Sequence, residues 1–181
     1  INYSLEDSFI NSIKISFENL KNNDPFFLST LLTIPGLSEL ESLFEKVDPI
    51  TIYRESLNFQ VSIGIKILED LRMFSEDVLV NINQRWPLGK GERKILGTIW
   101  SYLALAGDSK IKRSCVDSIS NPSMTIARAA LGALKPLDCN ETKEASNLFY
   151  NIWKDNPVVL DSWFAYEASR SSKQGIHMIE K

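Results

Sequence analysis

Apolar residues recur along the chain at intervals of three and four, the spacing that places them on one face of an α-helix. Between residues 145 and 153 they follow the i, i+3, i+4, i+7, i+8 template without a gap. Comparable stripes occupy residues 5–20, 95–103, 127–134 and 160–168. We therefore expect about nine or ten helices of ordinary length.

Proline after Asp or Asn marks four expected helix starts. The side chain can accept hydrogen bonds from the first turn, and proline at the first helical position sacrifices no hydrogen bond. The four pairs are Asp24–Pro25, Asp48–Pro49, Asn121–Pro122 and Asn156–Pro157. Further starts are expected as capping boxes at Ser4–Asp7 and Ser38–Glu41, and as simple caps at Ser75 and Asn140. Glycines between the stripes, such as Gly36, Gly89 and Gly107, are expected where helices end and the chain turns.

One segment, Val61–Ile65, competes with the helical pattern because it is rich in the β-branched residues that favour strands. The helical period continues on both sides of it, so we predict a helix. Gly64 would then cost about 1 kcal/mol relative to alanine, unless a neighbour packs on it. The predicted fold class is all-α.

Short amphipathic helices with short loops must bury their stripes on successive neighbours. This requirement favours stacked helical hairpins that form an irregular armadillo/HEAT-like α-superhelix. We expect residues 1–181 to be part of one helical domain, with a sub-domain hinge near residues 86–91. The chain begins without Met and ends in polar sequence, so we expect a piece of a longer polypeptide.

The composition is that of an ordinary soluble protein, with 181 residues, 44% hydrophobic and 24% charged. A formal net charge of −3 argues against a nucleic-acid partner, which requires clustered cations. No apolar run approaches the roughly 20 residues that cross a bilayer, and no signal peptide is visible, so no membrane partner is expected. Cys115 and Cys139 form no CxxC pair, which is typical of reduced thiols in a cytoplasmic protein.

The sequence offers no candidate catalytic, cofactor-binding or metal-binding residue. His177 is the only histidine, and neither HExxH nor another metal-ligand spacing is present. No GxSxG nucleophile motif occurs. Gly89–Lys94 lacks the GxxxxGK[ST] pattern of a phosphate loop, so we expect a turn into a helix with Glu92 in its first turn. Neighbouring carboxylates such as Glu76 and Asp77 face different directions on a helix and cannot act together.

Two remaining clusters are interpreted as structural. Lys110, Lys112 and Arg113 are expected on a solvated helix face, the usual role of a charge run. Trp153 and the Trp163–Phe164 pair lie on helical stripes, so we expect them in the core.

Four strings resemble motifs of one protein family. Ile34–Phe44 with Val47–Pro49 looks like "LPSxxEMAELFxxxDP", and Gly91–Ala104 is similar to "GRRALKNxxLxYLA". Met124–Leu134 resembles "NMTDxxAAL", and Phe149–Ala165 looks like "FYxxWxxDPLVMDKWFALQA". These are motifs of bacterial-type zinc aminopeptidase N, and they occur here in the family's order.

The resemblance, which covers about residues 25–169, implies part of the C-terminal helical domain of such an enzyme. In the family, an upstream thermolysin-like domain carries the HExxH zinc site, and the helical domain closes a chamber for peptide substrates. Zinc would thus belong to the parent enzyme, while this chain holds no cofactor and is inactive alone. Its partners would be its own catalytic domain and the peptides. The resemblance implies structural roles for Asp161, Trp163 and Phe164.

The residues also leave another class of function open. An all-helical chain without catalytic groups could be a free-standing α-solenoid module that grips a peptide or a helix. An HExxH-x18-E pattern upstream of this chain would favour the aminopeptidase, and its absence would favour the interaction module.

Overall fold

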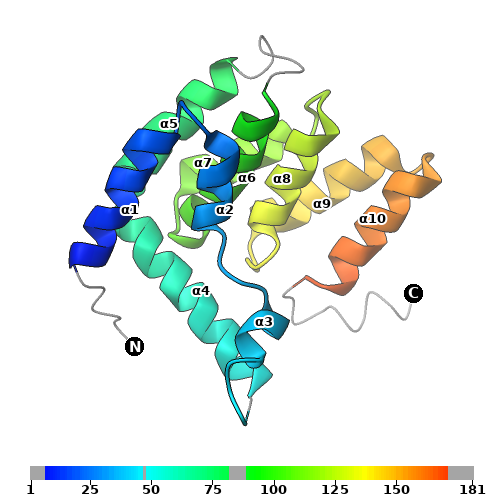
Figure 1. Cartoon of the computed structure of the whole chain (residues 1–181). Coiled ribbons are helices and arrows are strands. Elements are labelled where there is room, and N and C mark those ends of the chain that lie inside the picture. Colours follow the sequence, from blue (N-terminus) through cyan, green and yellow to red (C-terminus); the bar gives the residue numbers. More distant parts are fainter. Residues whose placement is uncertain (1–6, 47, 82–88, 171–181) are drawn as a thin grey trace. The chain divides into compact units, whose positions relative to one another are not determined.

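The computed structural model describes residues 7–46, 48–81 and 89–170, and within these residues it contains ten α-helices and no strand (Figure 1). The helices are α1 (Asp7–Leu20), α2 (Pro25–Leu32), α3 (Leu37–Glu41), α4 (Pro49–Lys66), α5 (Leu68–Asn81), α6 (Lys90–Leu105), α7 (Ser109–Ser118), α8 (Met124–Leu134), α9 (Asn140–Trp153) and α10 (Pro157–Ala168). The all-α prediction is confirmed for this part of the chain. None of these helices is long and apolar enough to cross a membrane.

The helices form two compact units, Ile1–Ala106 and Gly107–Lys181. At the boundary, α6 ends at Leu105, and Gly107 follows with φ of +92°, a left-handed conformation that glycine adopts without steric cost. Half of the hinge expected at residues 86–91, namely residues 86–88, lies outside the described residues, and the hinge stays a prediction.

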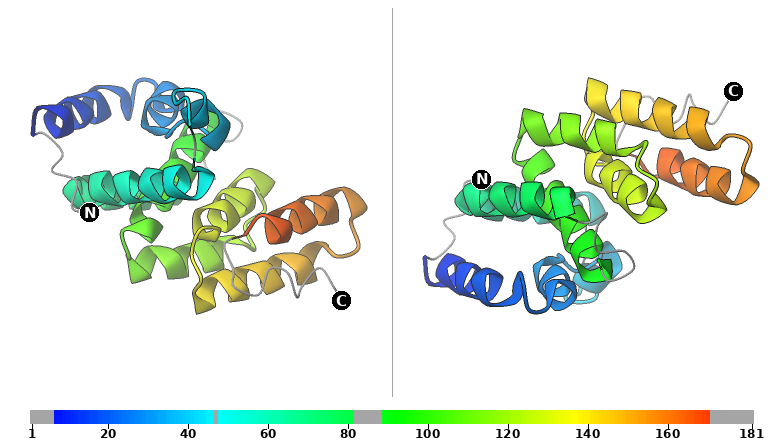
Figure 2. Two further views of the ribbon diagram at one scale, coloured as in Figure 1. Left: turned by 90° about the horizontal axis from the view of Figure 1, so that it is seen from below. Right: turned by 90° about the horizontal axis from the view of Figure 1, so that it is seen from above.

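In the first unit, α6 is the central helix and packs against α2, α4 and α5. Figure 2 shows α1 and α2 (blue) in one layer and α4 and α5 (cyan to green) in the next. The stripe predicted on α6 is fully buried, with exposed fractions of 0–1% for Ile95, Leu96, Ile99, Trp100 and Leu103. This burial of one whole helix face supplies the core of the unit.

Two contacts attach α6 to its neighbours. The Tyr102 hydroxyl donates a hydrogen bond to the Leu32 carbonyl oxygen at 2.7 Å, and burial raises the pKa of Tyr102 to about 12. On the other side, a Cβ added at Gly64 would lie 3.0 Å from the Tyr102 carbonyl oxygen. The helix predicted over Val61–Ile65 is confirmed, and α6 does pack on its glycine.

In the second unit, α8 buries the stripe predicted for it, Ala127, Ala130, Leu131 and Leu134. Helix α10 packs on α9 through Trp163, whose indole N–H donates to the Ser146 hydroxyl at 2.9 Å. The Ser146 hydroxyl donates to the Glu167 carboxylate, which also pairs with Arg170 at 3.1 Å. Trp163 therefore fixes one helix against the other, as the family resemblance implied.

The core position predicted for Phe164 is wrong, because this side chain is 55% exposed. One residue along an α-helix turns the side chain by about 100°. The face of α10 that carries Trp163 and the buried Tyr166 therefore cannot include Phe164. The ring of Phe164 meets that of Trp163 edge to face, with the two centroids 5.2 Å apart.

Three of the four predicted Asx–Pro helix starts are confirmed. Asp24 accepts a hydrogen bond from Phe27 N, Asp48 from Ile50 N, and Asn156 from Val159 N. The fourth is wrong, because α8 begins two residues after Pro122. There the Asn121 side chain accepts from Ser123 N at 2.9 Å, which makes a turn before the helix.

The other predicted starts are shifted or lie elsewhere. The box expected at Ser38 begins at Gly36, whose N–H donates to the Glu39 carboxylate at 2.9 Å. Ser75 lies inside α5, and its hydroxyl donates to the Arg72 carbonyl oxygen. Asn140 is the first residue of α9 and follows the cap position. The box at Ser4–Asp7 lies mostly outside the described residues.

Candidate functional site

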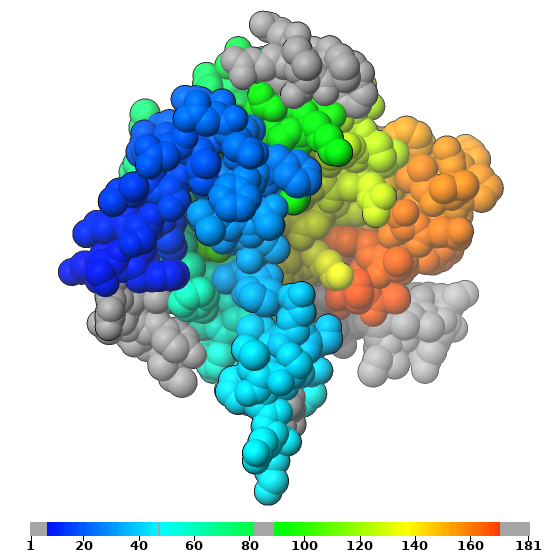
Figure 3. Space-filling model, viewed as in Figure 1, coloured from blue at the N-terminus to red at the C-terminus, as the bar shows by residue number. Residues whose placement is uncertain are grey.

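Helices α3 and α4 bury few of their residues completely. All eighteen residues of α4 are described, and only Ile63 and Gly64, near its C-terminal end, are buried. None of the five residues of α3 is buried. Helix α3 packs on α4 (Figure 1), and in the space-filling view this part of the unit projects at the lower end, in cyan (Figure 3). Surface that packs so little inside its own unit is available for a ligand or a partner.

A cavity of about 650 Å³ lies along the N-terminal half of α4. Its floor on α4 includes Ile52, Ser56 and Phe59. The facing wall comes from α3 and from the segments on either side of it, and its apolar members are Ile34, Pro35, Leu40 and Phe44. The cavity therefore offers an apolar surface bounded by two helices.

A second cavity of about 230 Å³ continues along α4 toward its C-terminal end and shares Phe59 with the first. The side chains facing α4 here come from α1 and α2 and include Phe9 and Leu31. The ring centroids of Phe9 and Phe59 are 6.0 Å apart. We call the two cavities together the α4 groove.

One face of α4 runs the length of this groove. Its members, Ile52, Ser56, Phe59 and Ile63, are spaced by four, three and four residues, which is the repeat of one helix face. At 1.5 Å per residue this face extends over roughly 16 Å. The groove is thus about three helical turns long.

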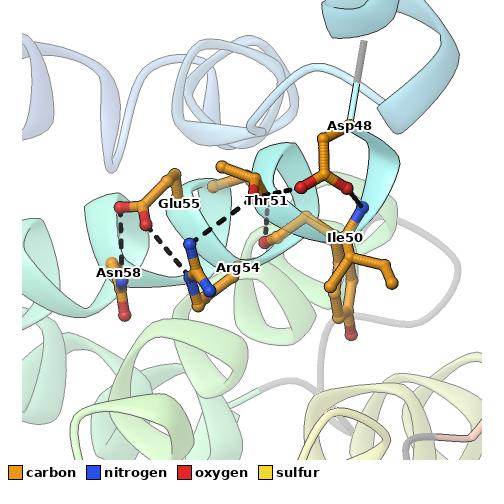
Figure 4. Close-up of polar contacts among 8 residues, drawn as sticks. Asp48, Ile50, Thr51, Arg54, Glu55 and Asn58 are labelled. Carbon is orange, nitrogen blue, oxygen red and sulfur yellow. Dashed lines mark hydrogen bonds and ion pairs between the residues drawn. The ribbon is translucent and has the colours of Figure 1, made fainter.

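The end of the groove at the start of α4 carries a carboxylate in a fixed position (Figure 4). Asp48 accepts hydrogen bonds from Ile50 N at 3.1 Å and from the Thr51 hydroxyl at 2.6 Å. The Thr51 hydroxyl, more than any other group, lowers the pKa of Asp48 because its hydrogen bond favours the charged form. Asp48 is therefore ionised at neutral pH.

The next turn of α4 carries a second carboxylate, Glu55 (Figure 4). Arg54 forms an ion pair with it at 3.1 Å, and the Asn58 side chain donates to its other oxygen at 3.3 Å. Glu55 lines the groove together with Asp48 and Thr51. The apolar floor thus has a polar, partly acidic rim.

The residues considered for catalysis from the sequence do not converge on a site. His177 lies outside the described residues, and among those described no group of three or more His, Cys, Asp or Glu side chains is placed to hold a metal ion. Cys115 is buried and Cys139 half-buried, both as free thiols. The described residues do not fit the zinc site of the resembled family, and we derive no catalytic step from them.

Two structural interpretations from the sequence are confirmed. The Gly89–Lys94 segment is a turn into α6, with Glu92 in the first turn of that helix. Arg113 lies on an exposed face of α7, where it pairs with Asp117 at 3.0 Å and with Glu144 at 2.9 Å.

The α4 groove was not predicted from the sequence. Its signal was present in two parts of the sequence. One is the helical spacing of Ile52, Phe59 and Ile63, and the other is the group of apolar residues in the preceding segment 34–44, which form the facing wall. A stripe of this kind ordinarily indicates burial in the core. That it lines an open groove depends on how α1, α2 and α3 are arranged around α4.

The described residues form stacked helical pairs and no strand, which is the architecture of an all-α helical-repeat protein. The chain belongs to the family described as "Domain of unknown function (DUF3458_C) ARM repeats", whose family model matches residues 2–181. It is 24% identical over 161 residues to Aminopeptidase N of Caulobacter vibrioides, an alignment that covers 80% of this chain and 17% of that protein.

The solved structure of Legionella pneumophila aminopeptidase A in complex with aspartic acid has the same fold. It superposes with a TM-score of 0.80 at 20% identity, over 98% of this chain and 22% of that one. The likeness to a C-terminal helical domain of an aminopeptidase, first indicated by the four motifs, is confirmed. The chain spans less than a quarter of the length of either relative.

Proposed function

We propose that this chain is the non-catalytic C-terminal helical domain of a zinc aminopeptidase that removes N-terminal residues from peptides in the cytoplasm. The observation that carries the proposal is family membership over residues 2–181, together with the likeness to Aminopeptidase N. The described residues add to it, because the helices bury their apolar faces against one another as a scaffold does.

In this role the domain acts by its shape. It walls the chamber around the active site, so that short peptides enter while folded proteins and long chains are excluded. Stacked helices suit this task because each fixes the position of the next, and the surface they build is broad. The zinc ion of the parent enzyme, held by the catalytic domain, would polarise the peptide carbonyl and activate water.

The first test is the coding sequence upstream of Ile1. The proposal expects an HExxH-x18-E zinc motif and a GxMEN motif there, and the absence of both overturns it.

The second test compares two substrates of the purified full-length protein that share one N-terminal residue. The first substrate is a short peptide, which should be cleaved quickly. The second is a folded domain that carries the same N-terminal residue on a leader too short to reach into the chamber, and this residue should not be removed. Equal rates would contradict the chamber wall.

A second function, a free-standing interaction module, is favoured by one observation, the apolar α4 groove. It predicts a gene that encodes no zinc motif and a protein that binds a peptide in this groove. Upstream sequence therefore separates the two functions without a binding assay.

A further inference from the structure

We propose that the α4 groove is the docking site for an apolar helix with basic flanking residues, supplied by the part of the same polypeptide that lies outside this chain. The inference rests on the proposed function, since it requires that the chain be one domain of a longer protein. It goes beyond that function by assigning the contact to one groove and by stating the chemistry of its occupant.

The first argument is the exposure of this region. Leu43 is 73% exposed, Phe44 58% and Ile50 76%, and all three lie in or beside the two helix ends that form the groove. Helices gain most of their stability from packing of their apolar faces, and contiguous exposed apolar surface commonly marks an interface. No residue of α3, and none of α4 before Ile63, is buried, and an occupant of the groove would cover part of this surface.

The shape of the groove fits a helix. Its two cavities meet at Phe59 and lie between helices, with apolar side chains on both walls. An amphipathic helix binds such a groove by inserting side chains spaced by three, four and seven residues. The floor of roughly 16 Å matches about three turns, enough for an anchor from each turn.

The charge around the groove favours a basic partner. Of the three charged side chains that line it, Asp48 and Glu55 are acidic and Lys46 is basic. The surrounding segment, residues 37–59, holds five acidic side chains against two basic ones. The acidic residues are Glu39, Glu41, Glu45, Asp48 and Glu55, and the basic residues are Lys46 and Arg54. Complementary charge selects the partner and its orientation, so the occupant should carry Lys or Arg beside its apolar face.

The same charge argues against a second copy of this chain as the occupant. If two copies met groove to groove, each would bring an acidic rim against the other, and like charges in contact are unfavourable. A segment of the same polypeptide has a further advantage. The chain corresponds to 17% and 22% of the length of its two relatives, and a tethered segment binds at a high effective concentration.

The experiment is site-specific photo-crosslinking in the full-length protein, expressed from its own gene. The photo-reactive residue p-benzoylphenylalanine replaces Ser56, on the floor of the groove, and in a control it replaces Met73, which is 70% exposed on α5. The proposal expects a crosslink within one polypeptide from position 56 to a segment outside residues 1–181. That segment should have apolar residues at helical spacing with Lys or Arg beside them.

Four outcomes overturn the inference. They are a crosslink to a second copy, a crosslink to another protein, a crosslinked segment without the expected apolar and basic residues, and crosslinking at position 56 no stronger than at position 73. Mass spectrometry of the purified product distinguishes them. Activity of the same sample tests the proposed function separately, because an active zinc aminopeptidase without this crosslink retains the function and loses the inference.

A charge variant with a matched control tests the basic flanks. Glu45→Lys reverses an exposed acidic residue, whereas Lys46→Glu makes the opposite change at the next position on the groove. In the full-length protein, E45K should speed amide hydrogen exchange in residues 49–62 several-fold, while K46E should leave it unchanged or slow it. Exchange in the buried helix α6 should stay the same in both variants. The same response to E45K and K46E, or no response to either, would contradict charge complementarity.

Discussion

The carboxylate of Asp48 holds the first turn of α4 through Ile50 N and the Thr51 hydroxyl. The hydrogen bonds favour its charged form, so its pKa lies below the ordinary value of 3.8. A carboxyl group whose pKa is lowered by folding stabilises the fold above its unfolded pKa. That contribution is lost as the pH falls through the lowered pKa. The start of α4 should consequently loosen only in acid, below about pH 4.

In the Thr51→Ala variant, loss of the hydroxyl should raise the pKa of Asp48 toward its ordinary value, because the largest cause of the shift is lost. NMR titration of the Asp48 carboxyl carbon measures the change, and Ser62→Ala, about three turns beyond Thr51 on α4, is the control that should leave the pKa of Asp48 lowered. A pKa of Asp48 that does not respond to T51A would show that the hydrogen bond is absent in solution.

The two cysteines should differ sharply in reactivity. Burial raises the pKa of the Cys115 thiol to about 12, and its side chain is 0% exposed, whereas Cys139 is half-buried. Since the thiolate is the reactive form, a thiol reagent at pH 8 should label Cys139 in the folded protein and reach Cys115 only when the second unit unfolds. Mass spectrometry of the labelled peptides across a urea series measures both. Equal labelling of the two in native buffer would contradict the buried position of Cys115.

At the scale of the elements, glycines decide how closely helices approach. Gly64 on α4 faces the Tyr102 backbone of α6, and a Cβ there would stand 3.0 Å from the carbonyl oxygen. Gly132 on α8 has no neighbouring atom within 4 Å of the same added group. Both lie within α-helices, so alanine gains helix propensity at each, by up to about 1 kcal/mol.

The two alanine variants should therefore change stability in opposite directions. Gly64→Ala should destabilise the protein by about 1–3 kcal/mol, because a backbone atom cannot move aside without separating α4 from α6. Gly132→Ala should stabilise it by up to about 1 kcal/mol. Chemical denaturation followed by circular dichroism measures both. Stabilisation by G64A would mean that the helices do not meet at this glycine.

The predictability of the elements varied with what surrounds them. The stripes of α6 and α8 were predicted correctly because these helices have neighbours on the face that the stripe marks. Phe9 lies on an equally regular stripe yet is 42% exposed. Periodicity identifies the apolar face of a helix, but only the tertiary arrangement decides whether another element covers it. For the same reason the sequence predicted the helix at residues 49–66 and did not predict its groove.

Local caps show a similar limit. Asp24, Asp48 and Asn156 begin helices as predicted, whereas Asn121, with the same following proline, makes a turn. The side chain of Asn bonds equally well to a turn or to a first helical turn. The choice between them lies in the residues that follow, and here the apolar positions begin at Met124.

For the molecule as a whole, the sequence motifs led to the right family because they occur in order over most of the chain. Membership in the ARM-repeat family and the fold of an aminopeptidase structure agree with that resemblance. The motifs held no catalytic residue, and the described residues bring together no metal-ligand group. The family is therefore shown, whereas the non-catalytic role as a chamber wall stays a proposal.

The most direct measurement is made on the purified 181-residue chain beside the full-length gene product, each incubated with zinc, dialysed and assayed on alanyl and leucyl reporter substrates. The chain should fold into helices by circular dichroism, retain no stoichiometric zinc and hydrolyse neither reporter. The full-length product should retain zinc and hydrolyse both reporters. Zinc bound at one ion per chain, with reporter hydrolysis by the chain itself, would contradict a non-catalytic role.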